Sequence, residues 1–566
     1  MWGFRLPEIV TRERDPAAFS ALIAANVDPR MARVYAARSI TSPFDLDHRL
    51  AALLSPAQLA CVQDAARLLA DAIQAGKRLL IVADYDADGA TACAVGMRAL
   101  GAMGAKVDFI VPNRFEFGYG LTPEIVALAA DRNPDIIITV DNGIASVEGV
   151  NEANRRGIQV LVTDHHLPGQ SLPEAAVIVN PNQVGDTFAS KNLAGVGVIF
   201  YTMSALRTEL RSRNYFDGKI EPNLADLLDL VALGTVADVV RLDHNNRVLV
   251  EQGLARIRAG RMSAGIRALL KVAGRDPHRV STYDLGFVIG PRLNAAGRLD
   301  DMSVGIACLL ADNERSAAEL ASKLDSLNRE RRVIESDMRQ VALVALETVD
   351  VGARYALSLF DPGWHQGVVG ILASRIREKY HRPVIAFAQD GQGNLKGSGR
   401  SISGFHMRDA LDLVTKRHPQ LIRKFGGHAM AAGLTIPESA MADFTHAFEA
   451  IARELLTPAD LAERIETDGT LDADELTFDF VQSIDAQVWG HGFSAPTFTG
   501  NFRVLEQRVV GEKHLKLKLS LGGDTFEAMR FGSADALNTR IDAVFRPSIN
   551  EFRGQSTLQL VLDYVA

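Results

Sequence analysis

The chain has 566 residues, with 61 Lys and Arg against 69 Asp and Glu, so its formal net charge is −8. Hydrophobic residues make up 47% and charged residues 23%, a composition typical of folded globular domains, which excludes a fibrous or largely disordered chain. At roughly 150 residues per domain, the length corresponds to about four domains. The acidic balance excludes a histone-like basic coat but is compatible with a local basic groove for nucleic acid.

Cysteine usage and hydropathy indicate the compartment. The three cysteines, Cys61, Cys93 and Cys308, share no metal-like spacing and cannot form a disulfide framework, which favours a reducing compartment. The first residues lack the basic start and apolar run of a secretion signal, and no uncharged stretch reaches the ~18 apolar residues of a membrane span. We therefore expect a cytoplasmic protein with no membrane partner. Since no feature indicates an oligomer, we expect a monomer.

The first half of the chain predicts a parallel sheet. Residues 1–75 have a mostly helical pattern, with Ala-rich periodic stretches. After them, nearly continuous apolar β-branched runs alternate with amphipathic helices, as in strands covered by helices on both faces. The runs lie at residues 78–83, 106–111, 135–140 and 158–163. Sheets of this kind bind ligands beyond the carboxyl ends of their strands.

The second half predicts a connector and two further domains. A charged helical stretch without Gly or Pro covers 315–347, and a second α/β pattern follows it. From about Ile465 the pattern is mostly β, with a turn at Gly522–Gly523, which fits a small barrel or sandwich. We therefore divide the chain into residues 1–75, 76–314, 315–347, 348–462 and 463–566.

Acidic residues and histidines follow three of the predicted strands and one apolar helix at 224–233. They are Asp84, Asp86 and Asp88 after the first strand, Asp141 after the third, Asp164, His165 and His166 after the fourth, and Asp238 after the helix. Carboxylates that converge in one crevice repel one another unless cations are bound. Oxygen ligands with imidazole suit Mn²⁺ or Mg²⁺ better than zinc, and this number of ligands suits two ions.

The alternative interpretation is structural. A single Asp-x-Asp after a strand is often a helix cap, and Asp-Asn-Gly is a common turn. Their joint occurrence at three strand ends favours a metal site. Two-metal sites activate water and stabilise the leaving oxygen in phosphoester hydrolysis.

These residues, in this order, resemble the DHH phosphoesterase superfamily and, within it, the RecJ family of bacterial single-strand-specific 5′→3′ exonucleases. The motifs that carry the resemblance lie between residues 82 and 433: VADYDADGATA, VDNGI, VTDHH, LGTVADVV, GPRLNAAGR, WHQGVVGILASR, GSGRS and FGGHAMAAG. The resemblance implies an α/β fold class. A parallel-sheet DHH domain (76–314) is joined by a long helix to a second α/β, DHH-associated domain (348–462), and an all-β OB-fold (463–566) follows.

The resemblance also implies a role for each residue of the acidic cluster. Asp86, Asp88, His165 and Asp238 are expected to bind metal, and Asp141 to bridge two ions. We expect Asp84 to be a weaker or indirect ligand and His166 to face the phosphate. Asp164 is expected to orient His165, as carboxylates behind metal-bound histidines do. Asp141, His165 and His166 are the expected catalytic residues.

Other motifs imply the substrate contacts. Arg114, near three aromatic residues, is expected to bind a 5′-phosphate. Ser398, Arg400 and Ser401 are expected to line a terminal-phosphate pocket, where the Gly-rich GSGRS would let backbone N–H groups approach an anion. The remaining expected substrate contacts are Arg292, Asn294, Arg298, His365, Gln366 and His428. For each of these alone, a structural role is an open alternative.

The predicted barrel contains one alternating strand, HLKLKLS. Its leucines, Leu515, Leu517 and Leu519, should face one side, and Lys516 and Lys518 the other. The lysine face is either simply solvated or follows a DNA backbone, and the second case would make binding salt-sensitive.

We therefore expect an exonuclease that degrades single-stranded DNA from the 5′ end to 5′-mononucleotides, with two Mn²⁺ or Mg²⁺ ions, in DNA repair and recombination. Single-strand-binding protein and a repair helicase are partners that the resemblance implies. One alternative is a DHH phosphodiesterase for short oligonucleotides, cyclic dinucleotides or pyrophosphate, which the chain length and the terminal β region disfavour. The other is a non-catalytic replication scaffold, which the complete acidic set disfavours.

Overall fold

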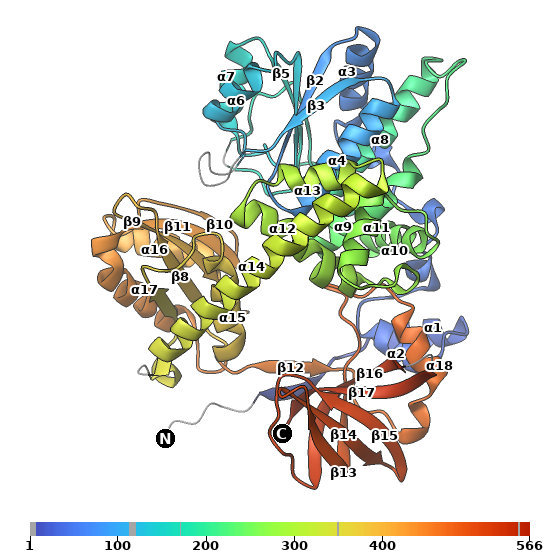
Figure 1. Ribbon diagram of the computed structural model, residues 1–566, viewed down its shortest axis with the longest axis vertical. Helices are drawn as coiled ribbons and strands as arrows, with labels where there is room; N and C mark the ends of the chain where they lie inside the picture. The colour runs from blue at the N-terminus through green and yellow to red at the C-terminus, as the bar shows by residue number, and fades with distance from the viewer. Residues whose placement is uncertain (1–6, 113–119, 170, 348–349, 553–554) are drawn as a thin grey trace. The chain divides into compact units, whose positions relative to one another are not determined.

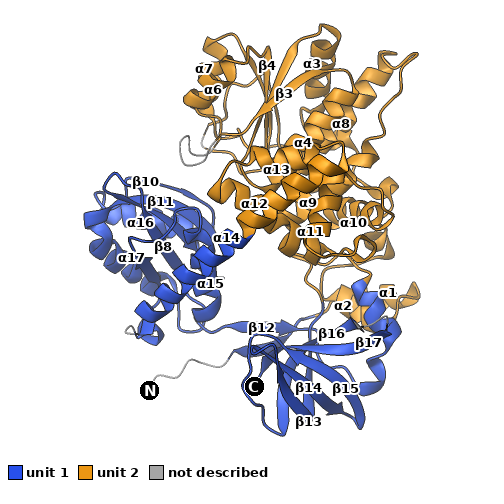
Figure 2. Cartoon of the chain, viewed as in Figure 1, with its two compact units in different colours: residues 1–13, 329–485, 496–566 blue, residues 14–328, 486–495 orange. Residues whose placement is uncertain are grey.

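The structure is a computed structural model that describes residues 7–112, 120–169, 171–347, 350–552 and 555–566. The chain divides into two compact units (Figure 2). Unit 1 comprises residues 1–13, 329–485 and 496–566, and unit 2 comprises residues 14–328 and 486–495. No helix in the described ranges is long and apolar enough to cross a membrane.

Unit 2 contains a five-stranded parallel sheet (Figure 1). Its order is β3-β2-β4-β5-β6, and every adjacent pair is parallel. The bounds are β2 Arg78–Ala83, β3 Lys106–Ile110, β4 Ile136–Val140, β5 Gln159–Thr163 and β6 Val177–Val179. The four predicted strands are confirmed, and β6 is a short edge strand that the sequence analysis did not find.

Helices cover both faces of this sheet, as continuous apolar strands require. On one face, α6 (Pro123–Ala130) and α7 (Val147–Arg155) bury Ile125, Val126 and Val150 against the strands. On the other face, α4 (Ala87–Ala102) and α8 (Gly195–Ser212) lie close to the sheet. A Cβ atom placed on Gly96 of α4 would lie 2.9 Å from a side-chain methyl carbon of Ile81 in β2. The strand ends are thereby held in place from both sides.

Helices form the rest of unit 2. The N-terminal helices are α1 Pro16–Ala24, α2 Pro29–Ala36 and α3 Val62–Gln74. After α8 come α9 Leu228–Ala237, α10 His244–Arg258, α11 Ala264–Val272, the π-helix η6 Asp284–Ile289, α12 Gly290–Leu299 and α13 Ser303–Leu310. The predicted connector is confirmed as a single helix, α14 (Glu314–Glu347).

Unit 1 contains a second five-stranded sheet in the order β10-β11-β9-β8-β7, in which only β7 and β8 are parallel. Its strands are β7 Leu357–Phe360, β8 Val384–Gln389, β9 Asn394–Arg400, β10 Lys424–Gly427 and β11 Ala431–Pro437. One face packs on α16 (Met407–Arg417) and α17 (Met441–Leu455) through Phe387, Leu434 and Phe444. Helix α15 (Val369–Tyr380) lies on β8 and β9.

The predicted C-terminal β domain is a closed barrel, β13-β14-β15-β17-β16. Its strands are β13 Phe498–Val510, β14 His514–Leu521, β15 Asp524–Arg530, β16 Arg540–Phe552 and β17 Gln555–Val565, with α18 Phe478–Asp485 before them. In β14 the leucines are buried and the lysines half-buried, as the alternation predicts. Strand β1 (Glu8–Thr11) lies in the N-terminal segment that was predicted to be helical, and it pairs in parallel with β12 (Arg464–Thr467).

Candidate metal centre

The first motif turns directly from β2 into α4. Asp86 caps the helix, because its Oδ1 accepts hydrogen bonds from the backbone N–H groups of Asp88 (2.9 Å) and Gly89 (3.0 Å). A Cβ atom on Gly89 would lie 2.5 Å from the backbone oxygen of Asp84, so only glycine lets the helix start so close to Asp84. Asp86 is therefore both a helix cap and a member of the acidic cluster, so the structural and the metal-site interpretations hold together.

Asp88 is fully buried and binds a second helix. Its Oδ2 accepts the N–H of Gly195 (2.6 Å) and its Oδ1 the N–H of Val196 (2.9 Å), at the start of α8. A Cβ atom on Gly195 would lie 2.6 Å from the Cβ of Asp141. Asp141 itself has a positive φ of 63°, a conformation that Asp and Asn tolerate better than most residues. The start of α8 thus brings the residues after β2 and β4 together.

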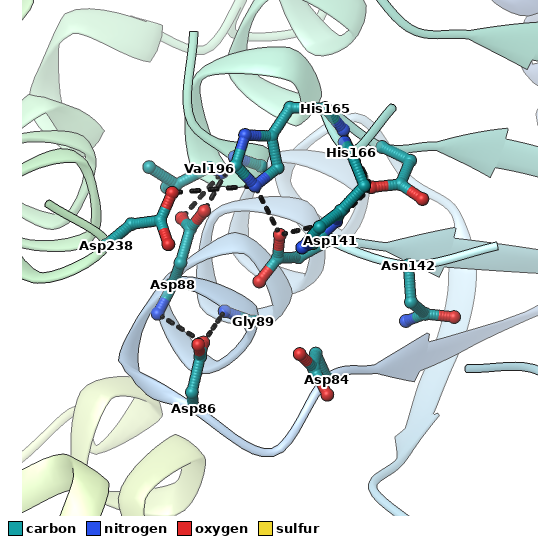
Figure 3. A network of polar contacts seen from close by, with 12 residues as sticks. Asp84, Asp86, Asp88, Gly89, Asp141, Asn142, His165, His166, Val196 and Asp238 are labelled. Atoms are coloured by element: carbon teal, nitrogen blue, oxygen red, sulfur yellow. Dashed lines mark hydrogen bonds and ion pairs between the residues drawn. The ribbon is translucent and has the colours of Figure 1, made fainter. Parts of the chain in front are cut away.

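The end of β5 supplies the histidines (Figure 3). His165 Nε2 lies 3.1 Å from Asp141 Oδ1 and 3.5 Å from Asp238 Oδ2. His166 Nδ1 lies 2.7 Å from Asp164 Oδ1 and 4.0 Å from Asp141 Oδ1. Asp164, which was expected to orient His165, accepts the backbone N–H of both histidines, but the ring that its carboxylate bonds is that of His166.

Three groups of side chains bring their ligand atoms within 4.8 Å of one another: Asp141, His165 and His166; Asp88, His165 and Asp238; and Asp84, Asp86 and Asp141. All seven residues come from the predicted set, and Figure 3 shows the carboxylates of Asp88, Asp141 and Asp238 around the ring of His165. Within the described residues, the buried Nε2 of His165 and Oδ2 of Asp238 make no hydrogen bond. A cation at this position would satisfy both atoms.

The crowding of carboxylates changes their pKa values. Burial, reinforced by Asp238, raises the pKa of Asp88 to about 8, and burial, reinforced by Asp86, raises the pKa of Asp238 to about 7. Burial and the neighbouring carboxylates also raise the pKa of Asp84 and of Asp141 well above the usual range. In such a cluster each carboxyl disfavours the charged form of its neighbours. Bound cations would stabilise the charged forms, so the cluster fits a cation site.

The pKa of His166 is raised, whereas the pKa of His165 is lowered. Burial alone would lower the pKa of His166, but the hydrogen bond and charge of Asp164 raise it to about 9. Burial, together with the charge of His166, lowers the pKa of His165. The lowered pKa of His165 favours the neutral form that a metal ligand needs, whereas the hydrogen bond with Asp164 favours a protonated His166.

The donor set fits Mn²⁺ or Mg²⁺. It contains five Asp carboxylates with one or two imidazoles and, in these groups, no thiolate. Oxygen-rich sets of this kind favour hard divalent ions, whereas structural zinc sites favour Cys and His. Asp84, which was expected to be a weaker ligand, lies in the third group with Asp86 and Asp141.

The residues of the GPRLNAAGR motif are placed on α12. Asn294 Oδ1 accepts the N–H of Ala87 (2.8 Å) and thus supports the loop of the metal centre. Arg292 is buried, with its guanidinium bonded to Asp325 and to the Val288 carbonyl. Arg298 is half-buried. Arg114 lies outside the described residues, so the structure gives no position for it.

The other predicted substrate residues lie in unit 1. Arg400 donates to Ser398 Oγ (3.0 Å) and to the Gly399 carbonyl, and a Cβ atom on Gly370 of α15 would lie 2.9 Å from both side chains. The buried Ser401 donates to the Phe405 carbonyl. Gln366 donates to the Gln389 carbonyl. His365 and His428 are exposed.

One expected property of GSGRS is wrong. Residues 397–400 belong to β9, a central strand paired with β8 and β11, so their backbone groups serve the sheet. The glycines are needed for packing instead: a Cβ atom on Gly397 would lie 2.5 Å from the Phe387 ring, and one on Gly399 would lie 3.1 Å from Met407 Sδ. An anion can therefore bind to the side chains of Ser398 and Arg400. The backbone N–H groups of this segment are used in the sheet and do not form an anion-binding loop.

The sequence analysis missed the residues that shape the histidine loop. Asn180 donates to the His166 carbonyl (2.9 Å) and Asn182 to the His165 carbonyl (2.6 Å). Both follow the short strand β6, in the run Asn-Pro-Asn. Two polar residues after a parallel strand were the available signal, since the other catalytic motifs occupy the same position.

Comparisons with known proteins agree with this site. Three family models match in the chain's own order: the N-terminal domain of the DHH family at residues 78–235, the DHHA1 domain at 352–454 and the RecJ OB domain at 467–564. Crystal structures of RecJ from Thermus thermophilus match 99% of this chain. The Mn²⁺ complex has a TM-score of 0.83 at 31% identity over 79% of that chain, and the Mg²⁺ complex 0.77 at 30% over 78%.

Curated relatives match over nearly their whole length. The single-stranded-DNA-specific exonuclease RecJ of Salmonella typhimurium is 49% identical over 566 residues, covering 97% of this chain and 98% of that protein. The Escherichia coli protein of the same name is 49% identical over 560 residues, covering 96% and 97%. With the same three domains, the same order of motifs and this identity, the chain belongs to the RecJ family.

Proposed function

We propose that this protein is an exonuclease that hydrolyses single-stranded DNA from its 5′ end and releases 5′-mononucleotides. The observation that carries the proposal is the convergence of Asp88, Asp141, His165 and Asp238 in one buried cluster. The curated relatives at 49% identity are named single-stranded-DNA-specific exonucleases, which supports the substrate class.

The chain's own residues would divide the work in this site. Asp86, Asp88, Asp141, His165 and Asp238 hold the ions, and Asp84 completes the set beside Asp86 and Asp141. Bound Mn²⁺ or Mg²⁺ supplies a more acidic water and stabilises charge on phosphate oxygens. His166, kept protonated by Asp164, places a positive charge beside the scissile phosphate and stabilises its developing negative charge.

The 5′→3′ direction rests on the family resemblance and on the pair Ser398 and Arg400. Their side chains meet the first turn of α15, where backbone N–H groups and the helix dipole favour an anion. Arg400 can therefore hold a terminal phosphate. Arg114, which lies outside the described residues, is a further proposed ligand for a 5′-phosphate.

The deciding experiment digests two single strands, one labelled at its 5′ end and one at its 3′ end, with Mn²⁺. We expect immediate release of the label as a mononucleotide from the 5′-labelled strand only. The Asp141→Asn protein is the control and should release none. Early mononucleotide release from the 3′-labelled strand would contradict the direction. Cleavage of short oligonucleotides or cyclic dinucleotides alone would move the protein to another DHH activity.

We also propose the domain borders 76–314, 348–462 and 463–566, because each family match lies inside one of them. The substrate favours a role in DNA repair and recombination in the cytoplasm. Single-strand-binding protein and a repair helicase are the proposed partners. Co-purification of either protein with the full chain would test the partnership.

A further inference from the structure

Two large aromatic side chains are exposed side by side on unit 2. The side chains of Tyr283 and Phe287 belong to residues that are 58% and 69% exposed. Their rings stack on each other with centroids 5.2 Å apart and planes 25° apart. Adjacent exposed aromatic rings are a costly surface for a globular domain unless something binds there. Neither residue has a role in the site described above.

The backbone under the two rings is firmly held. Asp284 is buried, accepts hydrogen bonds from the N–H and Oγ of Ser281 (both 3.0 Å) and pairs with Arg275 (3.3 Å). Thr282 Oγ1 donates to the Trp489 carbonyl (2.7 Å), within the same unit. The rings thus project from a fixed segment, which lowers the conformational entropy that binding would cost.

The segment that carries the rings packs on the metal centre. Phe287 lies in the π-helix η6, a type of element that is frequent at functional sites. A Cβ atom on Gly286 would lie 3.2 Å from Val236 Cγ1, and one on Gly290 would lie 3.1 Å from Ala237 Cβ, so η6 touches the last turn of α9. The next residue of that turn is Asp238.

The same element leads to the metal centre by a second route. η6 continues into α12, where Asn294 holds the N–H of Ala87 in the first motif. The segment that carries the exposed rings therefore connects two of the segments that carry candidate metal ligands.

The surroundings of the rings favour a nucleic acid over a protein. Arg275, His278 and Arg279 are exposed on the turns just before Tyr283, where Arg275 pairs with Asp284 and Arg279 lies 3.8 Å from Asp276. From Arg256 to Arg279 the chain carries seven Lys and Arg against the single Asp276. Exposed aromatic rings beside cations are the combination by which proteins bind single strands, because every base has a face that can stack.

We propose that Tyr283 and Phe287 form a base-stacking platform for the single strand whose phosphate is cut at the metal centre. The proposal rests on the proposed function for the identity of the strand. A duplex hides the faces of its bases, so the platform accepts unpaired bases only. It therefore contributes to the selection of single strands, and it is tolerant of base sequence.

The test measures equilibrium binding of a short fluorescent oligothymidylate to the full chain in the Asp141→Asn background, so that no hydrolysis is needed. An abasic strand with the same number of phosphates is measured in parallel. We expect Phe287→Ala to weaken binding of the oligothymidylate about tenfold, the usual loss for one stacked base, and to leave binding of the abasic strand unchanged. Tyr283→Ala should act in the same direction.

Two further variants separate stacking from packing. Phe287→Trp should retain the affinity, whereas Phe287→Leu, which keeps the apolar bulk, should not. Phe44→Ala is the matched control, since Phe44 is 63% exposed in the same unit, and it should change neither strand. Equal loss with both strands, or no loss with Phe287→Ala, would overturn the platform and leave a protein partner for this surface.

Failure of the platform and failure of the proposed function give different results. If the unsubstituted protein degrades single strands and Phe287→Ala binds them normally, only the platform is wrong. If no strand is degraded but Phe287→Ala still loses the preference for bases over abasic sites, the platform stands and the activity is reassigned.

Discussion

The strand ends of unit 2 and the barrel of unit 1 use charge in opposite ways. At the strand ends, Asp84, Asp88 and Asp141 are buried within one cluster of like charges. On the barrel, charges are partly exposed and paired across strands: Lys516 lies 2.8 Å from Glu527, and Arg546 lies 2.7 Å from Asp563. The buried cluster is electrostatically unfavourable unless a cation binds, whereas the charges of the barrel are already neutralised by their own partners.

The difference shows where function can be inferred from electrostatics. Buried like charges cost several kcal/mol and persist only where another component compensates them, so they identify a cation site. Exposed pairs contribute ~0–1 kcal/mol and are common on any surface. The lysine face of β14 therefore carries much less functional information than its sequence pattern suggests.

The largest effect should come from Asp141→Asn. Loss of a ligand shared by two of the three groups should lower kcat by about 10³-fold or more, because metal ions contribute several kcal/mol to such reactions. The amide tolerates the φ of 63°. Since burial raises the pKa of the Asp141 carboxyl, the metal-free variant should melt no lower than the unsubstituted protein. Near-normal turnover, or a large loss of Tm in chelator, would contradict the role.

Metal affinity should depend strongly on pH. With the pKa of Asp88 raised by burial to about 8 and that of Asp238 to about 7, both carboxyls hold protons at about pH 6 in the metal-free protein. Ions must displace these protons, so affinity should rise about tenfold per pH unit for each proton released, up to about pH 8. Calorimetry with Mn²⁺ in buffers of different ionisation enthalpy measures the release.

The same carboxyls link pH to stability. In the unfolded chain they ionise near pH 4, whereas in the folded protein they keep their protons to about pH 7–8. Between these values the folded state binds more protons, so the metal-free protein should lose stability as pH rises. The increase in Tm on adding Mn²⁺ should therefore be larger at about pH 8 than at about pH 6. If neither the Mn²⁺ affinity nor the increase in Tm changed with pH, the carboxyls of the cluster would already be ionised in the metal-free protein.

Arg400→Ala should act on the substrate end rather than on the chemistry. Loss of a charge-assisted hydrogen bond should lower kcat/KM for a 5′-phosphorylated strand about 10- to 100-fold. A strand with a 5′-hydroxyl should change little, and Arg400→Lys should recover part of the loss. Competition between the two strands measures the preference. An unchanged preference would remove Arg400 from the phosphate pocket.

Lys516→Ala should have the smallest effect. The pair with Glu527 is half-exposed, so we expect a loss of unfolding free energy of ~1 kcal/mol or less. The rate of digestion should fall less than about threefold at low salt and not at all at high salt. A tenfold fall in DNA affinity would show that the lysine face of β14 binds the DNA backbone, and the barrel would then use its charges for function as the metal centre does. Lys518→Ala provides the matched comparison.

The periodicity of apolar residues and the position of acidic residues after the strands were sufficient to predict much of the fold and the location of the metal centre. Four continuous apolar runs predicted β2 to β5, because strands buried on both faces leave no polar alternation. The carboxyl ends of parallel strands share one edge, so residues after those strands had to converge. The long helix α14 and the leucine alternation of β14 followed from spacing alone.

Contacts between distant segments were not available from spacing. The imidazole that Asp164 bonds depends on how the histidine loop folds back, and it is the ring of His166, while His165 is held through its backbone N–H. The bond from Asp88 to Gly195 joins residues 107 positions apart. GSGRS has the composition of an anion-binding loop, but packing against Phe387 makes it a central strand.

The sequence by itself placed the acidic residues and the histidines after the ends of the strands, since the chain's own periodicity fixes where the strands end. Only the tertiary structure decided how those residues are oriented, protonated and supported. Hydrogen bonds and desolvation depend on distances of a few ångströms between segments far apart in the chain. The exposed pair of Tyr283 and Phe287 is of this second kind, because exposure is a property of the folded molecule.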